Sequence, residues 1–250
     1  MITIKDLTKS FHGKKVLDRI SVTFEPGKTN LVIGMSGSGK TVLLKSIAGL
    51  HEIDNGEIWY EKTLFNKLDF NEKKEIRTQI GMLFQGSALF DSMTVEQNVR
   101  FPLDMFTNKS PAEKNERVNF CLNRVNIIGV NKLFPGELSG GMKKRVAIAR
   151  AISLNPRYLF CDEPNSGLDP ITAILIDALI KELTEEYSMT TIINTHDMNS
   201  VMEIGEKIIF ISNGKKYWEG NKNEVLHSEC GPLNDFVFAN PLAKKLKAMY

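Results

Sequence analysis

The sequence predicts an α/β fold with a parallel sheet in its core, and two observations support that prediction. Between residue 158 and the turn at Gly214, short apolar segments alternate with helical patterns, which is typical of a parallel sheet covered by helices. Upstream, the apolar run 29–33 leads through a glycine-rich loop into the helical pattern 41–48. Of the 250 residues, 42% are hydrophobic and 25% are charged, so the chain can bury the core of such a sheet.

Smaller elements are expected around this sheet. Short alternating strands are predicted within residues 1–30, and residues 56–60 have the same β character. From about residue 71 to 131 the pattern becomes mostly helical and polar. The strands of the first segment are predicted at 2–4, 16–17 and 20–24.

The glycine-rich loop has the chemistry of a phosphate site. It matches G-x-x-x-x-G-K-[ST], the P-loop motif, and stands between a strand and a helix as the motif requires. Its backbone N–H groups and the helix start would bind phosphate oxygens, Lys40 would reach the β- and γ-phosphates, and Thr41 would ligate Mg²⁺. The alternative, a chance Gly/Ser-rich turn, leaves this context unexplained. The loop and its first helical residues are Gly34, Met35, Ser36, Gly37, Ser38, Gly39, Lys40, Thr41 and Val42.

Two adjacent carboxylates follow the apolar run 158–161. Asp162 would end a buried strand, where a Walker-B aspartate holds Mg²⁺. Glu163, one residue on, projects in another direction and could polarise the attacking water. The alternative is that both carboxylates simply cap the next helix. The P-loop upstream favours the catalytic interpretation.

A third motif suggests a second anion site. Leu138, Ser139, Gly140, Gly141 and Met142 precede a basic helix, so Ser139 and the glycines form a helix start that could bind an anion. One nucleotide does not need two such sites in one chain, whereas two copies facing head to tail would each complete the other's site. The alternative is a serine-capped helix after a Pro-Gly turn.

Composition argues against several classes of protein. The formal net charge is only +2, which gives no electrostatic case for nucleic acid as the main partner. No apolar run approaches the roughly 18 residues of a membrane span, and the first residues lack the pattern of a signal peptide. The cysteines Cys121, Cys161 and Cys230 lack metal-ligand spacing, so inert thiols in a reducing compartment are expected.

Together these motifs make the chain resemble an ABC-type ATPase subunit over nearly its whole length. The P-loop matches Walker A, residues 138–142 match the ABC signature, and Asp162 with Glu163 matches Walker B and the catalytic glutamate. Residues 166–169 match the D-loop. Met142 and Gly167 stand where the family commonly has Gln and Ala, which leaves the fine contacts of the signature and D-loop open. The remaining matches are Phe11, Gln85, Asp169 and His196.

The resemblance implies a role for each of these residues. Phe11 would stack on adenine, and Gln85 would contact Mg²⁺ and the attacking water. His196 would contact the γ-phosphate, and Asp169 belongs to the D-loop. Without the resemblance, Phe11 would be core packing, Gln85 a surface or cap residue, and His196 a structural histidine.

The resemblance also implies an architecture and a set of partners. The fold would be a P-loop NTPase with a mixed-sheet core, an N-terminal antiparallel β subdomain and an inserted helical subdomain at about 87–156. The ATPase domain would span 1–229, followed by an extension at 230–250. ATP and Mg²⁺ would bind between two copies, and an integral membrane permease would hold the dimer at the cytoplasmic face of the inner membrane.

The segment 84–103 narrows the resemblance further. Its Gly-Ser-Ala-Leu-Phe stretch and the Leu-Ser-Gly-Gly-Met signature are similar to those of the Mce-type (Mla) phospholipid-transport ATPases. That similarity implies glycerophospholipid as substrate and a lipid-binding Mce-domain protein as a further partner. Rival interpretations are the ATPase of a solute importer, a non-transport regulator acting through a membrane partner, and a nucleic-acid maintenance ATPase. The last lacks support, since the chain has neither a long heptad run nor a repeat.

The same segment is the predicted docking site for the permease. Its apolar residues are irregularly spaced between polar ones, so a short helix of the membrane subunit could lie among them. The alternative is that they pack the helical subdomain. These residues are Leu89, Phe90, Met93, Val95 and Phe101.

Overall fold

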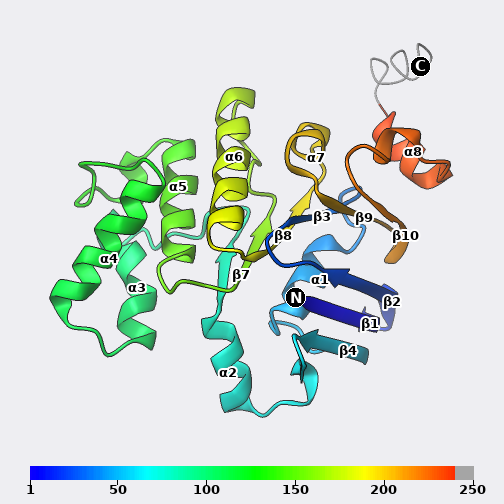
Figure 1. Cartoon of the computed structure of the whole chain (residues 1–250), viewed down its shortest axis with the longest axis horizontal. Coiled ribbons are helices and arrows are strands. Elements are labelled where there is room, and N and C mark those ends of the chain that lie inside the picture. Colours follow the sequence, from blue (N-terminus) through cyan, green and yellow to red (C-terminus); the bar gives the residue numbers. More distant parts are fainter. Residues whose placement is uncertain (240–250) are drawn as a thin grey trace.

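A six-stranded mixed sheet runs through the middle of the molecule (Figure 1). The computed structural model describes residues 1–239. The strands of this sheet are β3 (Thr29–Ile33), β6 (Ile80–Leu83), β7 (Tyr158–Asp162), β8 (Thr190–Thr195), β9 (Lys207–Ser212) and β10 (Lys215–Gly220). The order across the sheet is β10-β9-β3-β8-β7-β6. All neighbours pair in parallel except β10, which is antiparallel to β9, so the predicted mixed-sheet α/β fold is confirmed.

A second, antiparallel sheet forms the N-terminal part, also as predicted. Its strands are β1 (Ile2–Phe11), β2 (Lys14–Phe24), β4 (Asn55–Tyr60) and β5 (Thr63–Leu64), in the order β2-β1-β4-β5. The strands expected separately at 16–17 and 20–24 are one strand, β2. Arg19 has a φ of 51°, and the β1–β2 register shifts nearby, which explains the gap in the sequence pattern.

Helix α1 (Lys40–Ile47) packs between the two sheets. Its Leu43, Leu44 and Ile47 are buried in one apolar cluster with side chains from both sheets, including Ile4 and Phe160. Packing against both sheets holds α1 in place. Its first residue is the P-loop lysine, Lys40.

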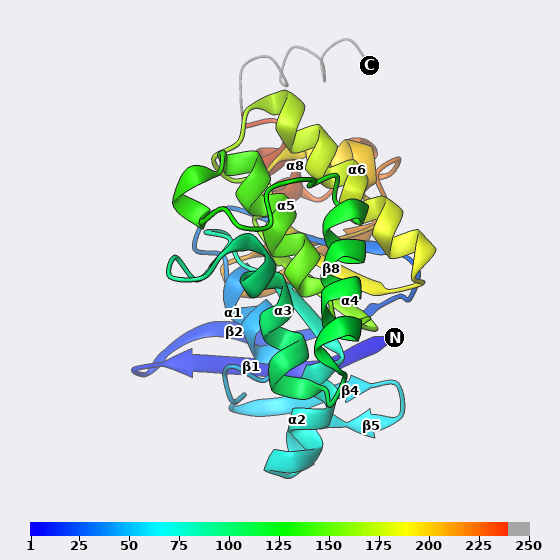
Figure 2. The same cartoon turned by 90° about the vertical axis from the view of Figure 1, so that its left-hand side faces the viewer.

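Three helices pack side by side at one end of the sheet (Figures 1 and 2). They are α3 (Val95–Phe106), α4 (Pro111–Arg124) and α5 (Gly140–Ala151). Thr94 and Ser110 each form a capping box with a residue three positions later, and Ser139 caps α5. Apolar side chains of all three helices join the core of the large sheet. The subdomain bounds 87–156 remain a prediction.

The prediction of a mostly helical segment from 71 to 131 is wrong at residues 80–83. After α2 (Phe70–Thr78), the chain forms β6, which pairs in parallel with β7 at the edge of the sheet. A Cβ on Gly81 would lie 2.5 Å from the Ala151 carbonyl oxygen, so this glycine lets β6 pass close to the end of α5. With only four residues, β6 is too short for its sequence to show the alternating pattern of a strand.

The other helices cover the large sheet and close the chain. They are α6 (Pro170–Glu186), α7 (Met198–Ile204) and α8 (Gly231–Val237), with short 3-10 turns at Phe65–Lys67, Pro135–Glu137 and Val225–His227. Residues 240–250 of the predicted extension lie outside the described residues. Within 1–239, no helix combines the length and apolar character needed to cross a membrane.

Candidate functional site

The P-loop joins β3 to α1 and buries its lysine. Lys40 is 6% exposed, and its Nζ donates to the carbonyl oxygens of Gly34 at 2.8 Å and Met35 at 3.1 Å. Burial lowers the pKa of Lys40, and the charges of Glu163 and Asp162 act in the opposite direction. Glu163 Oε1 lies 3.7 Å from Nζ. The ammonium is therefore held beside two carboxylates and aimed at the loop.

Two P-loop positions accept only glycine. Gly34 has a φ of 148°, and a Cβ there would lie 2.1 Å from the Ile211 carbonyl oxygen. Gly39 has a φ of 108°, and a Cβ would lie 2.8 Å from a Leu17 side-chain atom. These left-handed or crowded backbone positions let the loop turn tightly onto the start of α1.

The loop fits a chain of phosphate groups. Ser38 Oγ is buried without a hydrogen-bond partner, and the Lys40 ammonium contacts only backbone carbonyls of the same loop and the Glu163 carboxylate. Buried donors next to a helix N-terminus are the groups that bind phosphate oxygens. The residues predicted to bind ATP phosphates therefore lie together and have donors to offer.

Oxygen ligands for Mg²⁺ lie beside the P-loop. Thr41 Oγ1 donates to Asp162 Oδ1 at 3.0 Å, and Gln85, whose Nε2 donates to Ser166 Oγ at 3.2 Å, borders the same cavity. Hydroxyl, carboxylate and amide oxygens are the ligands that Mg²⁺ takes, usually with several waters. The three residues predicted as Mg²⁺ ligands thus fit that ion chemically.

Glu163 meets two of the other predicted site residues. Its Oε2 lies 2.8 Å from His196 Nδ1, while Oε1 faces Lys40. Glu163 has a φ of 49°, a strained value for a residue with a side chain, and its N–H donates to the Asn194 carbonyl at 3.0 Å. The two carboxylates therefore have different partners. Glu163 contacts Lys40 and His196, whereas Asp162 accepts from Thr41 and Asn194.

Asn194 was not predicted and lies at the centre of this arrangement. It is fully buried at the end of β8, and its Nδ2 donates to Asp162 Oδ1 at 2.9 Å. Its backbone carbonyl accepts from Glu163, so it supports both carboxylate residues. The only sequence signal was an amide in an otherwise apolar and threonine-rich strand.

The site opens into a cavity of about 1100 Å³, large enough to hold a nucleotide. Three consecutive residues of the predicted C-terminal extension, 235–237, also border it, which the sequence did not indicate. Phe236 is fixed there by its ring contact with Phe210 at 5.5 Å. The predicted site residues that line the cavity are Met35, Ser36, Gly37, Gly39, Lys40, Thr41, Val42, Gln85, Glu163 and His196.

Phe11 is not among the residues that line this cavity. Its ring packs edge-on against His51 at 5.3 Å, and Lys9 Nζ lies 5.1 Å from its centroid. Val16, on the neighbouring strand, borders the cavity instead. The adenine-stacking role of Phe11 stays a prediction.

The signature and the D-loop aspartate act as helix caps in this chain. Ser139 Oγ accepts from Met142 N at 3.3 Å, and none of residues 138–142 lines the cavity. Figure 1 shows α5 in the helical group, away from α1. Asp169 caps α6 by accepting from Thr172 N at 3.0 Å, and the hydrogen bond from the Thr172 side chain lowers the pKa of Asp169.

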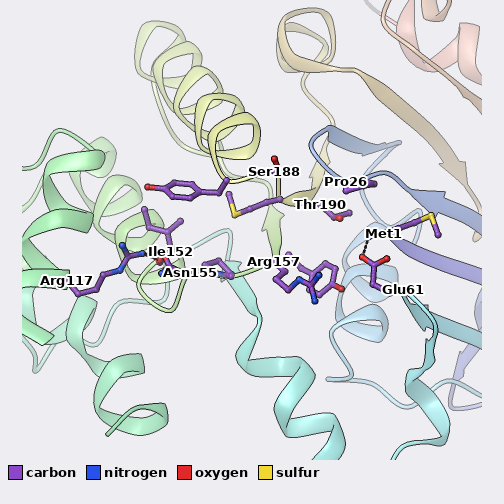
Figure 3. A pocket seen from close by; sticks show the side chains of 13 residues that line it. Met1, Pro26, Glu61, Arg117, Ile152, Asn155, Arg157, Ser188 and Thr190 are labelled. Carbon is purple, nitrogen blue, oxygen red and sulfur yellow. Dashed lines mark hydrogen bonds and ion pairs between the residues drawn. The ribbon is translucent and has the colours of Figure 1, made fainter. Parts of the chain in front are cut away.

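A second cavity, of about 380 Å³, opens at the other end of the same strands (Figure 3). Tyr158 and Thr190, the first residues of β7 and β8, border it together with Arg157 and Ser188. Ligands of parallel sheets bind at the carboxyl ends of the strands, where the first cavity lies. The first cavity is therefore the candidate active site.

Known proteins share this chain's sequence and fold. The family model described as ABC transporter matches residues 17–166. The methionine import ATP-binding protein MetN of Carboxydothermus hydrogenoformans is 37% identical over 250 residues, covering 98% of this chain and 74% of that protein. The intermembrane phospholipid transport system ATP-binding protein MlaF of Haemophilus influenzae is 36% identical over 229 residues, covering 92% and 87%.

A solved structure agrees with the sequence comparison. The ATP-binding cassette MJ0796, in a dimeric post-hydrolysis state bound to ADP and Pi, superposes with a TM-score of 0.81 at 32% identity. The match covers 89% of this chain and 99% of that one. With the P-loop and the Asp162–Glu163 pair in place, the chain belongs to the ABC transporter family and is one of its ATPases.

Proposed function

We propose that this ATPase powers phospholipid transport through a separate membrane permease in an Mce/Mla-type system, at the cytoplasmic face of the inner membrane. The observation that carries the proposal is the match to MlaF, which covers 87% of that protein, against 74% of MetN. The resemblance of segment 84–103 to Mla-type ATPases points the same way. A lipid-binding Mce-domain protein would complete the system.

Two copies would bind ATP head to tail. Lys40 and Ser38 of one copy would bind the phosphates, and Ser139 with Gly140 and Gly141 of the other copy would close over the γ-phosphate. The similarity to MJ0796, a cassette solved as a dimer with ADP and Pi, supports this arrangement. The start of the signature helix lies outside the chain's own cavity, so it could contact ATP only in a second copy.

Hydrolysis would depend on the residues grouped at the strand ends. Bound Mg²⁺ would neutralise charge on the β- and γ-phosphates, and Thr41, Asp162 and Gln85 are the residues that would hold it. Glu163 would accept a hydrogen bond from the attacking water and orient it. His196, 2.8 Å from Glu163, would keep that carboxylate in position and contact the γ-phosphate.

The permease would dock on the loop before α3 and on α3 itself, which carries Phe101. Phe90 is 42% exposed, and its ring lies 4.9 Å from that of Phe101, so the two form an apolar surface. Val95, one of the predicted docking residues, is 1% exposed and belongs to the core instead. The docking proposal therefore rests on Phe90 and Phe101.

A solute importer is the second candidate, and the MetN match along 98% of this chain favours it. The two candidates differ in what the membrane partner binds. In both, ATP hydrolysis by this chain supplies the driving force.

Substrate retention distinguishes them. The chain is purified in complex with the membrane protein encoded beside it, and bound small molecules are identified by mass spectrometry. Phospholipid retained by the complex, and moved between labelled vesicles with ATP but not in the Glu163→Gln variant, is the expected result. A complex that retains no lipid and takes up amino acids would support the importer and refute lipid transport.

A further inference from the structure

The first half of the loop that carries Gln85 is held by the signature helix, and its second half by Asn98 of α3. Residues 84–94 connect β6 to α3, and two cationic side chains of α5 donate to three carbonyls of this loop. Lys144 Nζ donates to the Gln85 carbonyl. Arg150 donates to the carbonyls of Ser87 at 2.8 Å and Ala88 at 2.7 Å. The loop backbone is thus attached to α5 at successive points.

The loop needs this attachment to keep its shape. Ser87 and Ala88 have φ values of 63° and 46°, two consecutive left-handed residues that are not glycine. Such conformations persist only where the surroundings hold them. Here the Arg150 guanidinium does so by binding both carbonyls at once.

Lys144 is a charged residue on the buried face of α5, where apolar residues are usual. It is 4% exposed, and among residues 1–239 no carboxylate forms an ion pair with it. Burial lowers the pKa of Lys144, while the charge of Glu163 acts to raise it. A buried cation without a paired anion is costly, so its hydrogen bond to Gln85 needs a reason beyond stability.

The position of Lys144 along α5 supplies that reason. It lies five residues after Ser139, or about one and a half helical turns, so the two move together. The side chain of Gln85 reaches the other way, into the nucleotide cavity, where its Nε2 donates to Ser166 Oγ. One residue of the loop therefore connects the chain's own nucleotide cavity to the helix that begins with the signature.

We propose that Lys144 is a positioning residue that fixes the Gln85 backbone to the signature helix, so that a nucleotide in the chain's own cavity sets the orientation of Ser139. The proposal rests on the head-to-tail dimer proposed above and not on the transported substrate. Lys144 touches no nucleotide. Its effect is on how binding at one P-loop prepares the signature for the other copy's ATP.

The test compares Lys144→Met with Lys143→Met, its half-exposed neighbour on the same helix. Binding of a fluorescent ATP analogue to the single chain should stay within about twofold of the parent. In a Glu163→Gln background, the ATP concentration for half-maximal dimerisation should rise about tenfold for Lys144→Met, a typical loss for a coupling residue. The KM for ATP hydrolysis should rise by a similar factor, because turnover requires the same dimer, while kcat at saturating ATP should change little. Lys144→Arg should restore both, and Lys143→Met should change neither.

Two further measurements decide the remaining outcomes. If Lys144→Met does not fold, Lys144→Leu, a shorter apolar residue without a donor, takes its place and should shift dimerisation in the same direction. Equal values for Lys144→Met and Lys143→Met would overturn the proposal, as would a parallel loss of ATP binding. If the Glu163→Gln parent does not dimerise with ATP, the proposed dimer fails, and an unchanged KM of Lys144→Met for ATP hydrolysis then refutes the role of Lys144 separately.

Discussion

Glu163, directly after β7, and Thr195, the last residue of β8, border the nucleotide cavity. At their amino ends the same two strands border the smaller cavity of Figure 3. The first end gathers buried charges: Lys40 is 6% exposed and Asp162 likewise. At the second end Arg157 is exposed, and the floor is formed by buried apolar residues such as Met189. One sheet thus presents two hollows of different chemistry.

The difference shows what a parallel sheet contributes to a site. At the carboxyl ends, Asp162, Glu163 and Asn194 hold one another through hydrogen bonds of 2.9 and 3.0 Å, and a strained backbone at Glu163 aims its side chain. These groups remain in place before a ligand binds, which is the electrostatic preorganisation that phosphoryl transfer requires. At the amino ends, exposed side chains are free to be hydrated, so charges there have little effect.

The largest effect expected from this comparison is at Glu163. Glu163→Gln keeps the shape and the contact distance to His196 but cannot accept a proton from water. The kcat for ATP hydrolysis should fall about 1000-fold, while ATP binding changes by only a few fold. Phosphate release in steady state and equilibrium binding of ATP measure the two quantities. A variant that hydrolyses ATP at the normal rate would remove Glu163 from its catalytic role.

Part of this site could be predicted from the sequence because it is encoded locally. The P-loop needs glycine at positions 34 and 39 and a lysine at 40, all within one short loop, and the Asp162–Glu163 pair ends a single strand. The mixed sheet followed from the alternation of apolar strands and helical patterns. These features depend on spacing along the chain, which the sequence displays directly.

Other parts depend on contacts between distant segments. Strand β6 exists because four residues pair with β7, and nothing in those four residues distinguishes a strand from a helix. Asn194 acts through Asp162, 32 residues away, and the residues 235–237 reach the cavity only because α8 packs back onto the core. The residue pattern within one segment does not show which distant segments it will contact.

Asn194 sharpens the comparison with a smaller effect. In Asn194→Ala, Asp162 loses a hydrogen bond at 2.9 Å that orients its carboxylate. Residues that orient a metal ligand typically contribute at least tenfold to metal affinity, so the Mg²⁺ concentration for half-maximal ATPase should rise about tenfold. Titration of Mg²⁺ at saturating ATP checks this. An unchanged Mg²⁺ requirement would mean that Asp162 is held by Thr41 alone.

The smallest effect is expected at the amino ends of β7 and β8. It tests whether the smaller cavity influences the nucleotide cavity. Arg157→Ala removes the exposed cation from the border of the smaller cavity without touching the backbone hydrogen bond from Arg157 N to the Gln79 carbonyl at 3.0 Å. Surface substitutions of this kind change free energies by less than about 0.5 kcal/mol, so kcat and the KM for ATP should stay within about twofold. The same steady-state assay, run beside Asn194→Ala, provides the measurement. A loss of activity as large as that of Asn194→Ala would show that the amino ends of the strands communicate with the nucleotide site, and the preorganisation of that site would then depend on both ends of the sheet.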